Sequence, residues 1–196
     1  MKQYKVIAIM GAAGVGKDTI LKCVLNLNNE LHGIVSHTTR PKRENEAYGV
    51  DYYYVSKENF QTKIENNEMI EYTIFNDWYY GTSFSALRED KINVGVFNPA
   101  GVRSLMENPD IDLIVYHVRA ADNVRLLRQL KRETNPNVDE IIRRYNTDKA
   151  DFSYSNLLDI PALVIWNDNE QDLVYSVQTI LNGAKKVQFL TDNFHI

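Results

Sequence analysis

A glycine-rich turn near the N-terminus constrains the fold of this chain more than any other stretch. It follows an apolar run, residues 4–10, that predicts a buried strand, and it precedes a helical pattern that starts at Lys17. Glycines allow successive backbone N–H groups to face one concavity, and the helix N-terminus adds partial positive charge. Strand, turn and helix in this order are typical of a loop that binds phosphates.

The turn has the complete spacing G-x-x-x-x-G-K of a nucleoside-triphosphate site, and the alternative is a plain turn between core elements. Asp18 stands where Ser or Thr usually supplies an oxygen to Mg²⁺, which makes Asp18 the candidate metal ligand. We expect the phosphates of a nucleoside triphosphate to contact this segment: Gly11, Ala12, Ala13, Gly14, Val15, Gly16, Lys17, Asp18 and Thr19.

The bulk composition excludes several classes of protein. A length of 196 residues with 44% hydrophobic residues suits one domain with small insertions, and the formal net charge of −4 argues against a general nucleic-acid binder. The single cysteine, Cys23, excludes an intrachain disulfide or a cysteine metal cluster and fits a reduced, cytoplasmic setting. We expect no signal peptide and no membrane span, and the sequence leaves monomer or homodimer open.

Strands alternate with helices along most of the chain, which predicts an α/β fold with a central, doubly wound parallel sheet. Residues 36–86, rich in tyrosine and strand signals, are expected to form a small mixed α/β insertion. The sequence leaves residues 184–196 open between a docked strand and a loose tail. Strands are expected at 4–10, 33–36, 52–55, 69–75, 78–80, 92–97, 111–118 and 162–166, and helices at 17–26, 57–66, 83–90, 99–108, 121–131, 138–149 and 169–182, the last ending near Gly183.

A second anion site is indicated by residues 36–43, which combine hydroxyl groups with three cations. Arginine side chains pair with phosphate oxygens through two parallel hydrogen bonds. Such clusters also occur on solvated surfaces, so these residues alone leave the two interpretations about equal.

Taken together, these segments resemble the guanylate kinase family. The resemblance rests on Ser-His-Thr-Thr-Arg-Pro-Lys-Arg at 36–43, Gly-Val-Asp-Tyr at 49–52, Ile-Glu-Tyr at 70–72 and Tyr-Tyr-Gly-Thr at 79–82. It implies a P-loop NTPase fold with a core of residues 1–35, 87–120 and 150–196, a nucleoside-monophosphate-binding region of residues 36–86 and a helical lid of residues 121–149.

The resemblance also implies a role for individual residues of the acceptor site. Arg40, Arg43, Tyr52 and Tyr80 would hold the phosphate of GMP, and Ser36, Glu71 and Thr82 would read the guanine, with Asn98 nearby. Guanine presents N1–H and an exocyclic amine, and one carboxylate such as Glu71 accepts hydrogen bonds from both. Adenine lacks this pair of donors and leaves the carboxylate unsatisfied. Without the family spacing, the sequence would favour Glu71 as an exposed strand residue and would allow Tyr52 and Tyr80 to be ordinary aromatic residues of a sheet.

On the donor side, the resemblance implies that Arg128, Arg132 and Arg143 are lid arginines that contact both nucleotides. Taken singly, arginines on helices are commonly solvated. Asn167 would lie beside the adenine of ATP. The implied reaction is transfer of the γ-phosphate of ATP to GMP or dGMP with Mg²⁺ as cofactor, in which Lys17, Arg40 and the lid arginines neutralise charge.

The sequence also departs from the family pattern. Lys42 and Asn45 replace a usual proline and a usual glycine, and Val96 and Asn98 stand where the family carries two acidic residues. Asp18 is the candidate replacement for the missing acid near the metal. These departures keep two alternatives open, an inactive guanylate-kinase-like binding module and a kinase for another nucleoside monophosphate. A GTPase is disfavoured because its guanine-reading Asn-Lys-x-Asp motif is absent.

Overall fold

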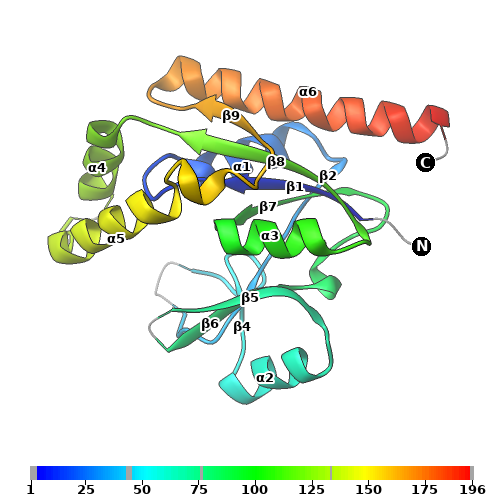
Figure 1. The fold of residues 1–196 in the computed structure, drawn as a ribbon, viewed down its shortest axis with the longest axis horizontal. Helices are drawn as coiled ribbons and strands as arrows, with labels where there is room; N and C mark the ends of the chain where they lie inside the picture. Colours follow the sequence, from blue (N-terminus) through cyan, green and yellow to red (C-terminus); the bar gives the residue numbers. More distant parts are fainter. Residues whose placement is uncertain (1–3, 43–45, 76, 133, 195–196) are drawn as a thin grey trace.

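A computed structural model describes residues 4–42, 46–75, 77–132 and 134–194. Helices cover both faces of a five-stranded sheet, and a smaller four-stranded sheet lies beyond α3 (Figure 1). The elements are β1 (Tyr4–Met10), α1 (Lys17–Leu27), β2 (Leu31–Gly33), β3 (His37–Thr38), β4 (Tyr53–Tyr54), α2 (Lys57–Glu65), β5 (Met69–Phe75), β6 (Trp78–Ser83), a 3₁₀ turn (Phe84–Ala86), β7 (Ile92–Phe97), α3 (Pro99–Glu107), β8 (Ile111–Arg119), α4 (Asp122–Lys131), α5 (Val138–Asp151), a second 3₁₀ turn (Ser155–Leu157), β9 (Ala162–Trp166) and α6 (Glu170–Phe194).

The central strand β1 is buried on both faces because helices cover the sheet on each side. Ile7 and Ile9 point toward α1 and α6, whereas the alternate residues Val6, Ala8 and Met10 point toward α3. This explains why the strand reads as a continuous apolar run rather than as an alternating one.

The order of the strands determines where a ligand can bind. The five parallel strands run β2-β7-β1-β8-β9, so the chain leaves β1 toward one edge of the sheet and later returns to fill the other side. In open sheets of this kind, ligands bind beyond the carboxyl ends of the strands, where the order reverses. The glycine-rich turn follows β1 directly at this point.

The smaller sheet is mixed, as expected for the insertion. Its order is β4-β3-β6-β5, with β3 parallel to β4 and antiparallel to β6, and β5 antiparallel to β6. An irregularity in β5 between Met69 and Glu71 brings Glu71 opposite Thr82 of β6. Pairing of β3 with β6 brings the beginning of the insertion beside its end.

The prediction of a helix at residues 83–90 is wrong, because only a 3₁₀ turn of three residues forms there. The buried Asn93 holds the following segment by accepting a hydrogen bond from Arg88 N at 2.7 Å and donating one to Arg88 O at 2.9 Å. These tertiary hydrogen bonds satisfy backbone groups that a helix would otherwise pair.

Two short strands also differ from expectation. Near residue 33 the strand is β2, Leu31–Gly33, because these residues pair with β7, and the chain then turns into the smaller sheet. Near residue 53 only Tyr53 and Tyr54 pair with β3.

The sequence predicts an end of the last helix near Gly183, but α6 continues to Phe194. A Cβ atom at Gly183 would lie 2.1 Å from Tyr116 Oη, so the glycine leaves space for this buried ring rather than terminating the helix. Among the described residues, no helix is both long enough and apolar enough to cross a membrane.

Candidate active site

The glycine-rich turn forms an open cradle at the start of α1. Gly14 and Gly16 have φ angles of 82° and 93°, which side-chain-bearing residues rarely adopt. Gly16 is the N-cap of α1 and leaves the first helical N–H groups without a side-chain cap. Unpaired N–H groups together with the helix dipole make this end of α1 a binding site for an anion.

Lys17 lies within the cradle, where its ammonium group donates to Gly11 O at 2.7 Å and Ala12 O at 3.0 Å. Burial lowers the pKa of Lys17, while the negative charges of Asp18 and Asp148 act in the opposite direction. A partly desolvated cation beside free N–H groups favours the binding of phosphate oxygens.

Asp18, the candidate metal ligand, is exposed in the first turn of α1. Its charge contributes to the raised pKa of Tyr52, so Asp18 lies near the acceptor residues as well as near Lys17. Within the described part of the chain, no group of three His, Cys, Asp or Glu side chains could enclose a metal ion. Mg²⁺ in nucleotide sites is commonly held by one or two carboxylates, substrate phosphates and water. A single carboxylate at this position therefore fits Mg²⁺ bound together with a nucleotide.

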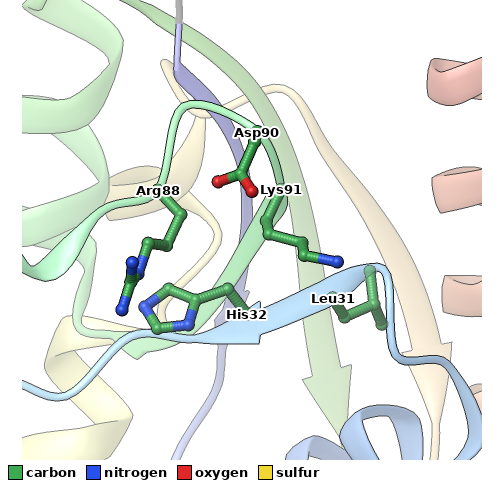
Figure 2. Close-up of a pocket in the computed structure, with 5 residues that line it drawn as sticks. All are labelled: Leu31, His32, Arg88, Asp90 and Lys91. Carbon is green, nitrogen blue, oxygen red and sulfur yellow. The ribbon is translucent and has the colours of Figure 1, made fainter.

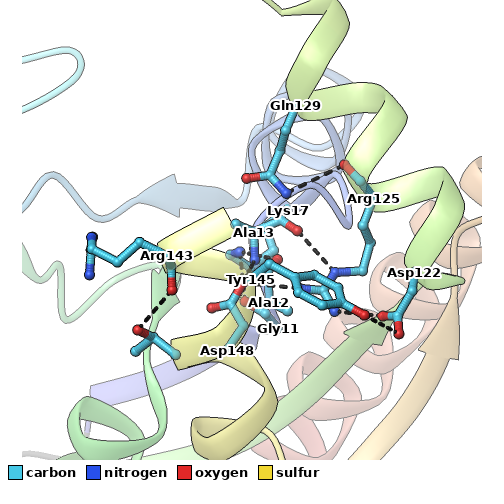
Figure 3. Close-up of polar contacts among 11 residues, drawn as sticks. Gly11, Ala12, Ala13, Lys17, Asp122, Arg125, Gln129, Arg143, Tyr145 and Asp148 are labelled. Carbon is cyan, nitrogen blue, oxygen red and sulfur yellow. Dashed lines mark hydrogen bonds and ion pairs between the residues drawn. The ribbon is translucent and has the colours of Figure 1, made fainter. Parts of the chain in front are cut away.

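A charged network that sequence reasoning missed joins α4 and α5 to the cradle (Figure 3). Arg125 is only 7% exposed, and its Nε donates to Ala13 O at 3.1 Å. Asp148 accepts hydrogen bonds from Ala13 N at 2.7 Å and from Arg125 at 3.0 Å. Asp122 binds Arg125 at 3.1 Å and the hydroxyl of Tyr145 at 2.7 Å. In the sequence these residues appear only as polar positions on two helices. Their contacts could not be predicted because they depend on how the two helices pack.

Arg128, an expected lid arginine, and Asn167, expected beside the adenine, contact each other at the back of the cradle. Asn167 is 3% exposed and donates to Val15 O at 2.7 Å, while its Oδ1 atom is buried without a partner. Arg128 donates to the carbonyl oxygens of Asn167 at 2.7 Å and Asp168 at 3.3 Å. These bonds connect α4 and the β9–α6 loop to the cradle.

The other two expected lid arginines are not brought to the cradle. Arg132 follows α4 and is exposed, with no side-chain hydrogen bond or ion pair to the described residues. Arg143 binds Glu140 one turn earlier on α5, and Figure 3 shows its side chain directed away from Lys17. The three arginines expected to act together therefore lie in three different surroundings.

The expected phosphate-holding residues lie together in the smaller sheet. The Arg40 guanidinium lies 5.4 Å from the centre of the Tyr52 ring, and the rings of Tyr52 and Tyr80 are 6.1 Å apart. Glu46, which sequence reasoning missed, binds Arg40 through two contacts of 2.8 Å and raises its pKa further. Arg43, the fourth expected member, lies outside the described residues, as does Asn45.

The three expected guanine-reading residues also come together. Ser36 Oγ and Thr82 Oγ1 are 3.1 Å apart, and Thr82 donates side-chain and backbone hydrogen bonds to Glu71. Burial raises the pKa of Glu71 from 4.5 to about 7, although the bonds from Thr82 oppose this change. The carboxylate packs beside the start of α3, where a Cβ atom on Gly101 would lie 3.3 Å from Glu71 Oε2.

Val96 and Asn98 occupy the positions of the two missing acids. Val96 is half-buried against the core, whereas Asn98 is the N-cap of α3 and accepts a hydrogen bond from Gly101 N at 2.7 Å. The Asn98 oxygen thus caps the helix, and both this oxygen and Glu71 Oε2 would lie 3.3 Å from a Cβ atom on Gly101.

Two cavities differ in their relation to this site. A pocket of about 190 Å³ adjoins the cradle and is lined by Ala12, Val15, Arg125 and Asp148 among others. A second pocket of about 240 Å³ lies at the edge strand β2, between His32 and the loop that precedes β7 (Figure 2). Its lining residues Leu31, His32, Arg88, Asp90 and Lys91 include none of the expected site residues.

Comparisons with known proteins identify relatives over nearly the whole chain. The family model described as "Guanylate kinase" matches residues 3–184. A guanylate kinase of Wigglesworthia glossinidia brevipalpis is 31% identical and covers 95% of this chain and 91% of its own length. A crystal structure of guanylate kinase from Anaplasma phagocytophilum shares the fold, with a TM-score of 0.64 at 19% identity over 100% of this chain and 98% of that one.

A partial match has a different name. MAGUK p55 subfamily member 7 of Xenopus tropicalis is 41% identical over 44% of this chain, which corresponds to 15% of that protein. The family model and the full-length relative, by contrast, span nearly the whole sequence. The chain belongs to the guanylate kinase family.

Proposed function

We propose that this protein transfers the γ-phosphate of ATP to GMP or dGMP, giving ADP and the nucleoside diphosphate. One observation supports the proposal: the glycine-rich cradle with Lys17 and the expected guanine-reading carboxylate Glu71 both lie at the carboxyl edge of the same sheet. The cradle follows β1, and Glu71 packs beside the start of α3, which follows β7. Asp18 links the two sets because its charge acts on both Lys17 and Tyr52.

In the donor half, the free N–H groups of α1 and the Lys17 ammonium group hold the outer phosphates of ATP. Bound Mg²⁺, with Asp18 as one ligand, would supply positive charge to the phosphate oxygens. Arg128 and Asn167 hold the back of the cradle in place, so the loop is already shaped before the nucleotide arrives. Residues 121–149 would act as the lid, which excludes water and suppresses hydrolysis of ATP.

In the acceptor half, residues 36–86 bind the monophosphate. Ionised Glu71 accepts hydrogen bonds from guanine N1–H and the exocyclic amine, while Thr82 fixes its orientation. Arg40 binds the phosphate by exchanging the Glu46 carboxylate for phosphate oxygens, and Tyr52 and Tyr80 close the site around it. This arrangement aligns the acceptor oxygen with the terminal phosphate of ATP, and such positioning supplies most of the catalysis in phosphoryl transfer.

The proposal is tested with Lys17→Ala, which removes a cation from the donor half alone. We expect this variant to lose turnover of ATP with GMP while its affinity for GMP, measured by calorimetry, is retained. Lys22→Ala is the matched control, since Lys22 is an exposed residue of the same helix. Turnover by Lys17→Ala close to that of the control would contradict the assignment.

The second candidate is a binding module that has lost catalysis. The uncharged Val96 and Asn98 at the positions of two family acids favour it, as does the partial match to a relative that is not named as a kinase. The complete cradle with Lys17 opposes it, because a module that only binds a partner has no use for a triphosphate site. Titration with ATP distinguishes the two, since the kinase requires Mg²⁺-dependent binding of ATP and the binding module requires none.

A further inference from the structure

Charged side chains that the proposed mechanism does not use bind both the backbone N–H and the backbone C=O of Ala13 in the cradle. Asp148 accepts a hydrogen bond from Ala13 N at 2.7 Å, and Arg125 donates one to Ala13 O at 3.1 Å. Arg125 also donates to Asp148 at 3.0 Å, which closes a ring of three contacts. Asp148 belongs to α5, 135 residues away from Ala13 along the chain.

The Asp148 carboxylate lies where the cradle presents its anion-binding groups. Its oxygen takes up one N–H group of the glycine-rich loop, and its charge acts on Lys17. Loop N–H groups and this lysine are the groups that bind phosphate oxygens in such loops. Asp148 also lines the pocket of about 190 Å³ beside Ala12 and Val15, so open space adjoins the contact. The carboxylate therefore stands in for a bound anion.

We propose that Asp148 competes with the phosphates of the donor nucleotide for the cradle, so that it occupies the loop when no donor is bound and weakens the binding of ATP. A triphosphate and a carboxylate repel each other, and one N–H group cannot serve both well. The inference rests on the proposed function only in taking a triphosphate as the ligand.

Displacement of Asp148 has a consequence for α5. The hydrogen bond between Ala13 N and the Asp148 carboxylate connects this helix to the cradle. Binding of the donor nucleotide therefore releases α5 from Ala13. Arg125 stays in place through Ala13 O and Asp122, and the guanidinium nitrogen that faced Asp148 becomes available to a phosphate oxygen. A ligand that favours the released state shifts α5 toward it.

The experiment compares the wild type with Asp148→Asn, which keeps an oxygen that can accept the Ala13 hydrogen bond but removes the charge. Asp139→Asn is the matched control, since it removes an exposed carboxylate from the first turn of the same helix. Dissociation constants are measured by calorimetry for ATP with Mg²⁺ and for inorganic triphosphate, which carries the charged groups without the nucleoside. Asp148→Ser is the second variant if Asp148→Asn does not fold, as judged by circular dichroism.

We expect Asp148→Asn to bind both ligands at least about fivefold more tightly than the wild type, the lower end of usual coupling between sites. Asp139→Asn should match the wild type. Equal or weaker binding by Asp148→Asn, or no binding of triphosphate by either protein, would overturn the inference. If Asp148→Asn binds the ligands more tightly but the wild type does not turn over GMP, the proposed function is overturned and the inference stands. If the wild type turns over GMP but Asp148→Asn does not bind more tightly, the inference is overturned and the proposed function stands.

Discussion

Glu71→Gln removes a partly buried carboxylate from the acceptor half while keeping the size of the side chain and an oxygen that can accept a hydrogen bond from Thr82. Burial raises the pKa of Glu71 from 4.5 to about 7. The folded protein therefore holds this proton between pH 4.5 and 7, whereas the unfolded chain releases it. The native state binds more protons in this window, so the contribution of Glu71 to the free energy of unfolding falls as the pH rises through it.

The size of the effect follows from the shift in pKa. A difference of one pKa unit corresponds to about 1.4 kcal/mol, so a change from 4.5 to about 7 corresponds to at most about 3 kcal/mol at pH 8. Gln carries no charge at any pH. We expect Glu71→Gln to raise the free energy of unfolding at pH 8 by up to this amount and to leave it nearly unchanged at pH 4.5.

The same carboxylate should control the binding of GMP in the opposite sense. At pH 6 about one tenth of a group with a pKa of 7 is ionised, so the KM for GMP should rise about tenfold between pH 8 and pH 6. Glu71→Gln should bind GMP weakly and lack this dependence, because guanine then meets no ionised acceptor.

Urea unfolding at pH 4.5 and 8, together with KM for GMP across this range, tests both halves of the argument. Equal free energies of unfolding for the wild type and Glu71→Gln at pH 8 would refute the claim that a desolvated charge on Glu71 destabilises the folded protein. Unaltered affinity of the variant for GMP would refute the role of Glu71 in reading the base.

Two further predictions concern the metal and the core. Asp18→Ser should lower turnover and weaken the dependence on Mg²⁺, because the variant loses a carboxylate whose charge acts on both Lys17 and Tyr52. Equal or faster turnover would count against Asp18 as the ligand. Gly183→Ala should destabilise the protein although alanine favours helix by about 1 kcal/mol, because its Cβ would lie 2.1 Å from Tyr116 Oη. Adding Tyr116→Phe should restore part of the loss in thermal unfolding, and no rescue would show that this contact is not the cause.

The elements predicted correctly from the sequence are those whose signal is local. The strand at Tyr4–Met10 is apolar because both faces are covered, and the start of α1 at Lys17 follows from the glycines that precede it. The family motifs also predicted that Ser36, Glu71 and Thr82 meet, and the register of β5 with β6 explains why they do.

What the sequence could not predict depends on contacts between distant segments. The segment expected as a helix at residues 83–90 is not helical, because Asn93 forms hydrogen bonds with the backbone of Arg88. A glycine lies inside α6 because the Tyr116 side chain leaves no space for a Cβ atom there. Arg125 and Asp148 follow the same rule, since each looks like an ordinary polar helix residue until α4 and α5 pack against the cradle.

A coupled assay of ADP release measures phosphoryl transfer from ATP to a guanine monophosphate. The protein is supplied with Mg²⁺, ATP and one acceptor at a time from GMP, dGMP, AMP, CMP and UMP. We expect ADP release with GMP or dGMP and far less with the others, because among these bases only guanine presents the paired donors that a carboxylate such as Glu71 can accept. Release with a different monophosphate, or with none of them, would contradict this expectation.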